Sequence, residues 1–181
     1  MVDTHATLEE LEAGLEAIRR APKESGVLEM IVRRPATNAR ELLEEAALDA
    51  DSGLVGDCWV ADLDGQRRTD VDTQLTVMNA RVIALVARDR SRWPLAGDQL
   101  YVDFDLSVDN VPPGTRLALG DAVIEASAEP HTGCRKFVDR FGVSAAKFVN
   151  SPTGRRLQLR GINARVVRPG RVRVGDVVSK V

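Results

Sequence analysis

The sequence predicts an α+β fold that is mainly β: a barrel-like sheet of short strands with several peripheral short helices. Short runs rich in β-branched residues recur along the 181-residue chain, and turns at 112–114, 120–121 and 169–170 separate some of them. Only a few stretches have helical periodicity. Long alternation of strands with helices is absent, which argues against a doubly wound parallel sheet.

The first half of the chain is predicted to begin with an amphipathic helix over residues 7–20. Its leucines and isoleucine recur at helical spacing, and Thr7 and Glu10 have the spacing of a capping box. The other expected elements are strands at 27–32 and 74–78, a strand or a helix at 40–47, a glycine-punctuated turn at 53–59 and a polar loop at 62–72.

In the second half, Asn79 is predicted to cap a helix over 80–93 that ends before Pro94. Ser151 and Pro152 are expected to cap and open a further helical turn. The other expected elements are a strand at 99–106, hairpin strands at 115–119 and 122–126, helical pieces at about 134–140 and 143–149, and strands at 162–167 and 172–178.

Length and composition are typical of one globular domain, with 44% apolar and 29% charged residues. We therefore expect a single domain over 1–181 with an N-terminal helical extension over 1–22. A net charge of −2 gives no global attraction to nucleic acid or acidic membranes. The acidic N-terminus is unlike a signal peptide, and no apolar run approaches the length of a membrane span. Two cysteines make no disulfide scaffold, so we expect a cytoplasmic protein.

The most unusual composition lies between His131 and Phe148, where one of the two cysteines, one of the two histidines and three of the four phenylalanines gather. A thiol reacts or binds a soft metal as the thiolate, and neighbouring cations such as Lys136 favour that form. Gly133 allows close backbone approach or a positive φ before Cys134. We predict that Cys134 is reactive beside a bound anion. The alternative is a small buried cysteine without chemistry.

Several neighbouring residues have two interpretations. His131 either tunes the thiol or carries a proton near neutral pH, or it is a hydrogen-bonded structural imidazole. With Cys134 it has the spacing of half a zinc site, but a zinc site needs four ligands. Asn163 bonds a ligand or a buried turn. Asp57 and Asp98 either orient basic groups or occupy turns.

The other cysteine and three phenylalanines also have predicted roles. Cys58, beside Trp59, is either a buried filler or a thiol that resolves oxidised Cys134. Three phenylalanines are expected in the core, at positions 137, 141 and 148.

Residues 129–167, which begin EPHTGCRKF, closely resemble the end of MOSC domains, named after the C-terminal domain of molybdenum cofactor sulfurase. Segments at 53–57, 74–87 and 97–125 also fit, so the resemblance covers most of the chain. It implies a MOSC-like β-barrel with a cleft in which the family cysteine, here Cys134, carries a persulfide or ligates the molybdenum of a pterin cofactor. Relatives include reductases of N-hydroxylated bases and the mitochondrial amidoxime-reducing component.

The resemblance also implies roles for individual residues. Cys134 would be the metal ligand and, with His131, a catalytic residue, and a soft thiolate suits that metal. Cationic side chains would bind the cofactor phosphate. The cofactor-binding candidates are Thr132, Gly133, Lys136, Arg155, Arg160, Asn163 and Asp98.

Two departures from the family pattern mark this chain. Cys58 follows Asp57 where a basic residue is usual, and Asp98-Gln99 stands where Glu-Asn is usual. Both turns are expected to border the cleft. From the Cys134 motif, its basic surroundings and the resemblance, we expect the chain to reduce a small N-oxygenated substrate with electrons from an external donor. The alternative is a sulfur carrier that accepts sulfur from a cysteine desulfurase, or a module that delivers the cofactor to a metalloenzyme.

Overall fold

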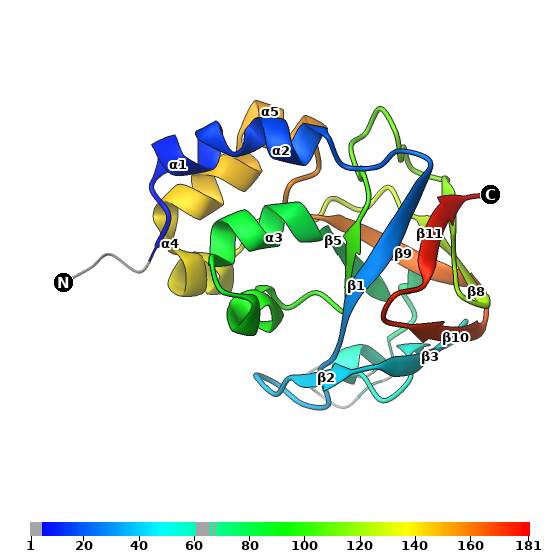
Figure 1. Ribbon diagram of the computed structural model, residues 1–181. Helices are drawn as coiled ribbons and strands as arrows, with labels where there is room; N and C mark the ends of the chain where they lie inside the picture. The colour runs from blue at the N-terminus through cyan, green and yellow to red at the C-terminus, as the bar shows by residue number, and fades with distance from the viewer. Residues whose placement is uncertain (1–4, 61–65, 67) are drawn as a thin grey trace.

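A computed structural model gives the structure of the protein and describes residues 5–60, 66 and 68–181. In this part of the chain, seven strands close into a barrel in the order β11-β7-β8-β9-β5-β6-β1, and β1 pairs with β11 to complete the ring (Figure 1). Neighbouring barrel strands are antiparallel except β5 and β6, which are parallel. The barrel confirms the predicted α+β, mainly β fold.

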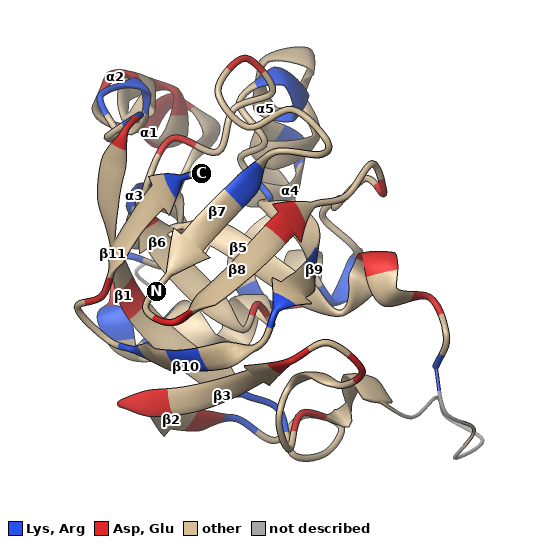
Figure 2. Ribbon diagram, turned by 90° about the vertical axis from the view of Figure 1, so that its right-hand side faces the viewer, with Lys and Arg blue, Asp and Glu red and all other residues tan. Residues whose placement is uncertain are grey.

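The strands are short, as the sequence predicts. β2 extends the barrel sheet beyond β1, and β10, β3 and β4 form a separate antiparallel sheet. The strands are β1 (Ser25–Arg33), β2 (Glu41–Leu43), β3 (Glu45–Asp49), β4 (Gly53–Leu54), β5 (Leu75–Asn79), β6 (Leu100–Asp103), β7 (Arg116–Leu119), β8 (Ala122–Ala126), β9 (Ile162–Arg168), β10 (Gly170–Arg173) and β11 (Val177–Lys180). Figure 2 shows β7 and β8 across the front of the barrel, with β10 and β3 beneath them.

The helices gather on one side of the barrel (Figure 1). They are α1 (Leu8–Ala13), α2 (Leu15–Arg19), α3 (Ala80–Ala87), α4 (Arg135–Asn150) and α5 (Pro152–Arg156), with 3₁₀ turns at Cys58–Val60, Val71–Thr73 and Arg90–Ala96. Among the described residues, no helix is long and apolar enough to cross a bilayer.

Two cores share the strands that separate them. On β6, Leu100 and Val102 point into the barrel, while Tyr101 between them packs against the helices. This follows from the two-residue period of a strand. On β1, a bulge after Leu28 shifts the pairing with β6, so that Met30 joins the helical core while Ile31 returns to the barrel.

The predicted helix caps are confirmed. Thr7 and Glu10 form the capping box of α1, with the Thr7 backbone N donating to Glu10 Oε2 at 2.7 Å. Asn79 caps α3 by accepting from the backbone of Arg81, and Ser151 caps α5. The two predicted helical pieces after Cys134 are joined as α4, with non-helical dihedrals at Gly142 between them.

Several predicted elements are wrong in length, and the helix expected over 7–20 divides at Gly14 into α1 and α2. The helix expected over 80–93 ends at Ala87, because Arg88 takes a positive φ of 62° and Asp89 caps a new 3₁₀ turn that contains Pro94. The strand expected over 172–178 breaks in the middle, where Gly175 has a φ of 95° and the Asp176 carboxylate accepts from the backbone of Arg173. A tight turn therefore separates β10 from β11.

The structure also resolves two other predicted segments, 40–47 and 99–106. The ambiguous segment 40–47 forms the strands β2 and β3, and the strand expected over 99–106 is confined to β6. The polar loop expected over 62–72 lies partly outside the described residues, which exclude 61–65 and 67.

Candidate functional site

Cys134 lies at the point where an irregular segment enters α4, and it is exposed. Its backbone carbonyl accepts from the N–H groups of Phe137 and Val138, which starts the helix. Its side chain makes no capping hydrogen bond to the helix, so the thiol is not used in the fold. The first turn of α4 also contains Lys136, whose side chain is exposed. Cys134 therefore stands at the positive, N-terminal end of the first helical part of α4, which is interrupted at Gly142.

Two hydrogen bonds fix the backbone immediately before Cys134. The N–H of Gly133 donates to Asn150 Oδ1 at 2.9 Å, and Asn150 Nδ2 donates back to the Gly133 carbonyl at 3.1 Å. A Cβ on Gly133 would lie 3.1 Å from both Asn150 Nδ2 and Val149 Cγ2. Gly133 does not have a positive φ, so of its two predicted uses the structure shows close approach, and the neighbour is the end of α4.

A buried polar cluster lies behind this segment. Arg160 Nη1 contacts Asp98 Oδ2 at 2.7 Å, with the Asp98 side chain fully buried and that of Arg160 6% exposed. His131 Nδ1 lies 3.5 Å from the other oxygen of Asp98, too poorly aligned for a hydrogen bond. Among the described residues, Asp98 Oδ1, His131 Nδ1 and Arg160 Nε have no hydrogen-bond partner. Asp98 therefore orients a basic group, which was one of its two predicted roles.

The environment of His131 determines its protonation state. Burial, together with the charges of Arg160 and Arg34, lowers the pKa of His131 to about 4, while the charge of Asp98 opposes the shift. The imidazole is therefore neutral at pH 7. A pKa of about 4 disfavours a role of His131 as a proton carrier near neutral pH, and its role toward the thiol stays a prediction.

The sequence analysis missed Arg34, which forms a second ion pair in the same region. Asp57 Oδ2 accepts from the backbone N and from Nε of Arg34, both at 2.9 Å, and Asp57 Oδ1 accepts from Nη2 at 2.7 Å. Arg34 Nη1 donates to the Gly97 carbonyl at 3.0 Å, which ties the two turns together. Burial lowers the pKa of Arg34, but the hydrogen bonds and charge of Asp57 outweigh burial. The pKa of Arg34 is therefore raised.

Two hollows lie on either side of this polar cluster. The histidine hollow, about 390 Å³, is lined by His131, Thr132, Asn150, Arg155 and Arg160, among others. The arginine hollow, about 750 Å³, is lined among others by Arg34, Arg40, Asp57, Cys58, Arg68 and Lys136. Because Thr132 faces the first hollow and Lys136 the second, the segment that contains Cys134 passes between them.

The arginine hollow is strongly cationic. Its lining has four cations and one carboxylate, Asp57, which is already bonded to Arg34. Burial lowers the pKa of Arg40, and the nearby charges of Arg140 and Arg34 lower it further. Cations that lower one another's pKa repel each other. A bound anion would relieve this repulsion.

Of the other predicted site residues, Arg155 lines a hollow, whereas Asn163 holds the backbone in place. Arg155 lines the histidine hollow and uses only Nε, which donates to the Asn150 carbonyl at 3.1 Å. Asn163 is buried on β9, and its Nδ2 donates to the carbonyls of Glu129 and Pro130 at 3.1 and 3.3 Å. It therefore holds the turn before His131, the structural one of its two predicted roles.

Cys58 and the phenylalanines also have clear positions. Cys58 is half-buried and lines the arginine hollow, so it is not a fully enclosed filler. Phe137, Phe141 and Phe148 are buried in the helical core, as predicted. In the part of the chain that the structure describes, no group of three or more His, Cys, Asp and Glu side chains is arranged to hold a metal.

Known structures share this architecture. The YuaD protein from Bacillus subtilis superposes with a TM-score of 0.61 at 16% identity, covering 85% of this chain and 94% of its own. YiiM from Escherichia coli gives a TM-score of 0.57 at 21% identity over 86% of this chain and 69% of its own. YiiM from Geobacillus stearothermophilus gives 0.53 at 13% identity, covering 88% and 73%. These identities support the fold alone.

The sequence itself identifies the family. No curated protein matches the chain. The family model described as MOSC domain, however, matches residues 54–179, which is more than half of the chain and includes Cys134, Asp98 and Arg160, whereas strand β1 and Arg34 precede this range. The protein belongs to the MOSC domain family.

Proposed function

We propose that this MOSC protein binds a molybdenum pterin cofactor with Cys134 as the metal ligand and reduces a small N-oxygenated substrate with electrons from an external donor. The observation that carries the proposal is the position of Cys134. Cys134 is exposed and makes no capping hydrogen bond, and its near neighbours in the sequence line two hollows, Thr132 the histidine hollow and Lys136 the cationic one.

The donor set fits such a cofactor. A thiolate is a soft ligand, which suits molybdenum better than a hard oxygen set would. The phosphate of the pterin would find Lys136, Arg68 and Arg40 in the arginine hollow, and Arg34 is held there by Asp57 with its charge intact. Cationic side chains of this kind form strong charge-assisted hydrogen bonds to phosphate oxygens.

The proposed reaction breaks the N–O bond of the substrate. Two electrons and two protons convert an N–OH group to N–H, and the oxygen leaves as water. The bound cofactor supplies the two-electron chemistry, and the protein supplies binding and orientation. His131 is neutral at pH 7, so it would act as a hydrogen-bonding group toward the substrate in the histidine hollow, and the protons would come from solvent.

Metal analysis after cofactor-replete expression tests the ligand assignment. We expect molybdenum in the wild-type protein and its loss in Cys134→Ser, which leaves a hard hydroxyl in place of the thiol. Equal molybdenum in the two proteins would show that Cys134 is not the ligand.

The proposal that Lys136 binds the cofactor is tested by comparing two lysines on α4. Lys136 lines the arginine hollow, whereas Lys147 is an exposed lysine later on the same helix that borders a different hollow. We expect Lys136→Gln to weaken cofactor retention during gel filtration and Lys147→Gln to retain it like the wild type. Equal retention by both variants would remove Lys136 from the site.

The exposure of Cys134 also supports a second candidate, a sulfur carrier. A thiol that is exposed at the start of a helix is open to a partner protein. Its thiolate would attack the terminal sulfur of a donor persulfide, and the donor thiolate would leave. Incubation with a cysteine desulfurase and cysteine, followed by persulfide labelling, separates the candidates, because a reductase without carrier function acquires no label that depends on Cys134.

A further inference from the structure

Two buried atoms that lack hydrogen-bond partners face each other beside the histidine hollow. His131 Nδ1 lies 3.5 Å from Asp98 Oδ1, and in the part of the chain that the structure describes neither atom forms a hydrogen bond. The Asp98 side chain is fully buried, and that of His131 is 15% exposed. Because an unpartnered polar atom in a buried site is costly, we expect these two atoms to satisfy each other.

The Asp98 carboxylate has a fixed position on its turn. Its Oδ2 accepts from Nη1 of Arg160, a permanently charged guanidinium, at 2.7 Å. The two carbonyls before Asp98 are bonded as well, that of Ala96 to Arg160 Nη2 at 2.9 Å and that of Gly97 to Arg34 Nη1 at 3.0 Å. An ionised carboxylate only accepts hydrogen bonds. The free oxygen Oδ1 is therefore an acceptor that the surrounding bonds hold in place.

The backbone on both sides of His131 is also fixed. Asn163 Nδ2 donates to the two carbonyls that precede His131, at 3.1 and 3.3 Å, and Asn150 bonds both the N–H and the carbonyl of Gly133 after it. The imidazole therefore stays beside Asp98 and moves only about its own side-chain torsions. The χ2 torsion of histidine has a broad minimum, so a modest rotation of the ring aligns Nδ1 with the carboxylate.

This arrangement favours one of the two neutral forms of the imidazole. At pH 7 His131 carries a single ring proton, on either nitrogen. With the proton on Nε2, the lone pair of Nδ1 would face the carboxylate, and two acceptors would meet in a buried site. With the proton on Nδ1, an N–H faces the acceptor. A separation of 3.5 Å leaves no space for a water molecule between the atoms, because each hydrogen bond to that water would itself span about 2.8 Å.

The other ring nitrogen lies on the accessible side. Nδ1 is enclosed, whereas the His131 side chain keeps 15% of its surface exposed and lines the histidine hollow. The ring atoms opposite Nδ1 are Nε2 and Cδ2, so the exposed edge is the one that carries Nε2. The bond made by one nitrogen of a histidine decides what the other can do.

We propose that Asp98 is a positioning residue for His131: it holds the imidazole with its proton on Nδ1, so that Nε2 presents a lone pair to the histidine hollow. A ligand group that meets His131 must then donate a hydrogen bond through an O–H or N–H, and a group that only accepts is disfavoured. For the substrate this rests on the proposed function, since an N–OH group donates to Nε2. The position of the proton is a property of the protein without cofactor or substrate.

Long-range ¹H–¹⁵N spectra of the ¹⁵N-labelled full chain at pH 7 test the position of the proton. The chain has two histidines, and His5→Gln removes the ring signals of the other one, which assigns those of His131. We expect the chemical shift of a protonated nitrogen at Nδ1 and that of an unprotonated nitrogen at Nε2. A proton on Nε2 would overturn the proposal. Because the spectra need neither cofactor nor substrate, this failure is distinct from a failure of the proposed reduction.

The variant Asp98→Asn separates positioning from a purely structural role. An amide has the shape of the carboxylate but can turn its NH₂ group toward Nδ1, so we expect the proton of His131 to move to Nε2. A role limited to the bond with Arg160 would change stability and leave the proton on Nδ1, and that result would overturn the proposal. The control Asp109→Asn alters an exposed carboxylate that is bonded to Arg156, and should keep the wild-type spectrum.

Acylation with diethyl pyrocarbonate tests whether the lone pair reaches the hollow, and it needs only the wild-type protein. The reagent modifies an unprotonated imidazole nitrogen, and Nδ1 of His131 is enclosed. We expect the peptide that contains His131 to be acylated in the native protein, as peptide mass spectrometry measures. Should Asp98→Asn fail to fold, this reaction and the wild-type spectrum still decide. Absence of native acylation, under conditions that modify His131 in the unfolded chain, would overturn the acceptor role.

Discussion

Asp98 and Arg160 meet at 2.7 Å with both side chains removed from solvent, and this pair joins the turn before β6 to the start of β9. Arg160 Nη2 also donates to the Ala96 carbonyl at 2.9 Å, and its guanidinium lies 5.0 Å from the centre of the Phe137 ring. The pair therefore connects the barrel to the first turn of α4, directly behind Cys134.

Removing one partner of this pair is expected to be strongly destabilising. Asp98→Asn leaves the buried Arg160 charge without a counterion, which costs about 3–5 kcal/mol in the free energy of unfolding. Urea denaturation measures this cost. The control is Asp109→Asn, which breaks the exposed pair with Arg156 and should change stability little, because exposed pairs contribute little. Equal losses in the two variants would contradict the argument.

The pKa of His131 predicts how stability depends on pH. The folded value of about 4 lies below the ordinary value of 6.5, so between these values the unfolded chain binds the extra proton. Stability from this group is therefore complete above about pH 6.5 and is lost as the pH falls toward 4, by about 3 kcal/mol in total. His131→Asn should flatten the stability curve across this window. An unchanged slope would place the imidazole in a more polar environment than the structure shows.

The two thiols are expected to differ in their reaction with maleimide. Cys134 is exposed, whereas Cys58 is half-buried in the wall of the arginine hollow. Access to the thiol limits its modification, so Cys134 should be labelled first in the native protein. Peptide mass spectrometry over time measures the order, and Cys134→Ser should abolish the fast phase. The same reaction in denaturant is the control, where the two cysteines should react at similar rates.

Gly161 is expected to be the glycine that tolerates alanine least at the site. Its φ is +101°, and a Cβ there would lie 2.3 Å from the carbonyl oxygen of Val77 on the neighbouring strand β5. Gly161→Ala should therefore destabilise the protein by several kcal/mol (about the sum of a backbone penalty and a steric clash). Gly114 has a φ of +88° with open space around it, so Gly114→Ala isolates the backbone penalty alone, about 1 kcal/mol. Similar losses in both variants would show that β5 gives way.

The barrel could be predicted from the sequence because its strands are short, β-branched and separated by strong turn signals. Caps were also predictable, since Thr7, Asn79 and Ser151 each bond backbone atoms only a few residues away. The end of α3 was not. Arg88 adopts a positive φ that its side chain does not favour, and nothing in the local pattern marks that position.

Part of the candidate site could also be predicted, because some of its residues are close together in the sequence. Cys134, His131 and Lys136 are close in sequence, so their composition stood out. Arg34 did not stand out, because its partners Asp57 and Gly97 lie 23 and 63 residues away and meet it only when the barrel closes. Signals for Arg34 did exist, since it lies two residues after the strand predicted at 27–32 and precedes Pro35, but many surface arginines share that context.

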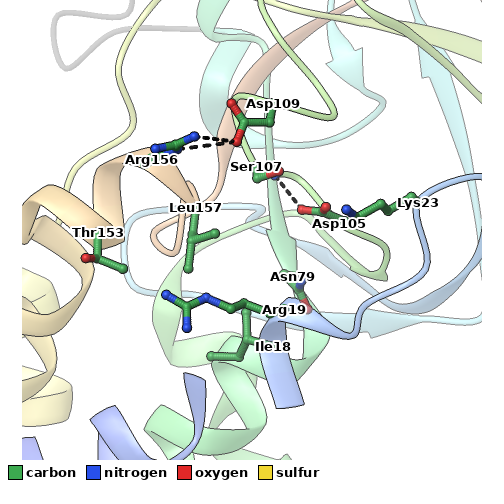
Figure 3. A pocket seen from close by; sticks show the side chains of 10 residues that line it. All are labelled: Ile18, Arg19, Lys23, Asn79, Asp105, Ser107, Asp109, Thr153, Arg156 and Leu157. Atoms are coloured by element: carbon green, nitrogen blue, oxygen red, sulfur yellow. Dashed lines mark hydrogen bonds and ion pairs between the residues drawn. The ribbon is translucent and has the colours of Figure 1, made fainter. Parts of the chain in front are cut away.

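The short helix α5 forms a wall that two hollows share. The two faces of the segment 153–158 border different hollows. Thr153, Arg156 and Leu157 line a hollow of about 420 Å³ that Ile18 and Asp105 also line (Figure 3). Gly154, Arg155 and Gln158 line the histidine hollow. A Cβ on Gly154 would lie 2.4 Å from the Phe148 carbonyl, so the helix is seated tightly on the end of α4. The two hollows therefore share one partition. A substitution that displaces α5 would therefore change the shape of both hollows at once.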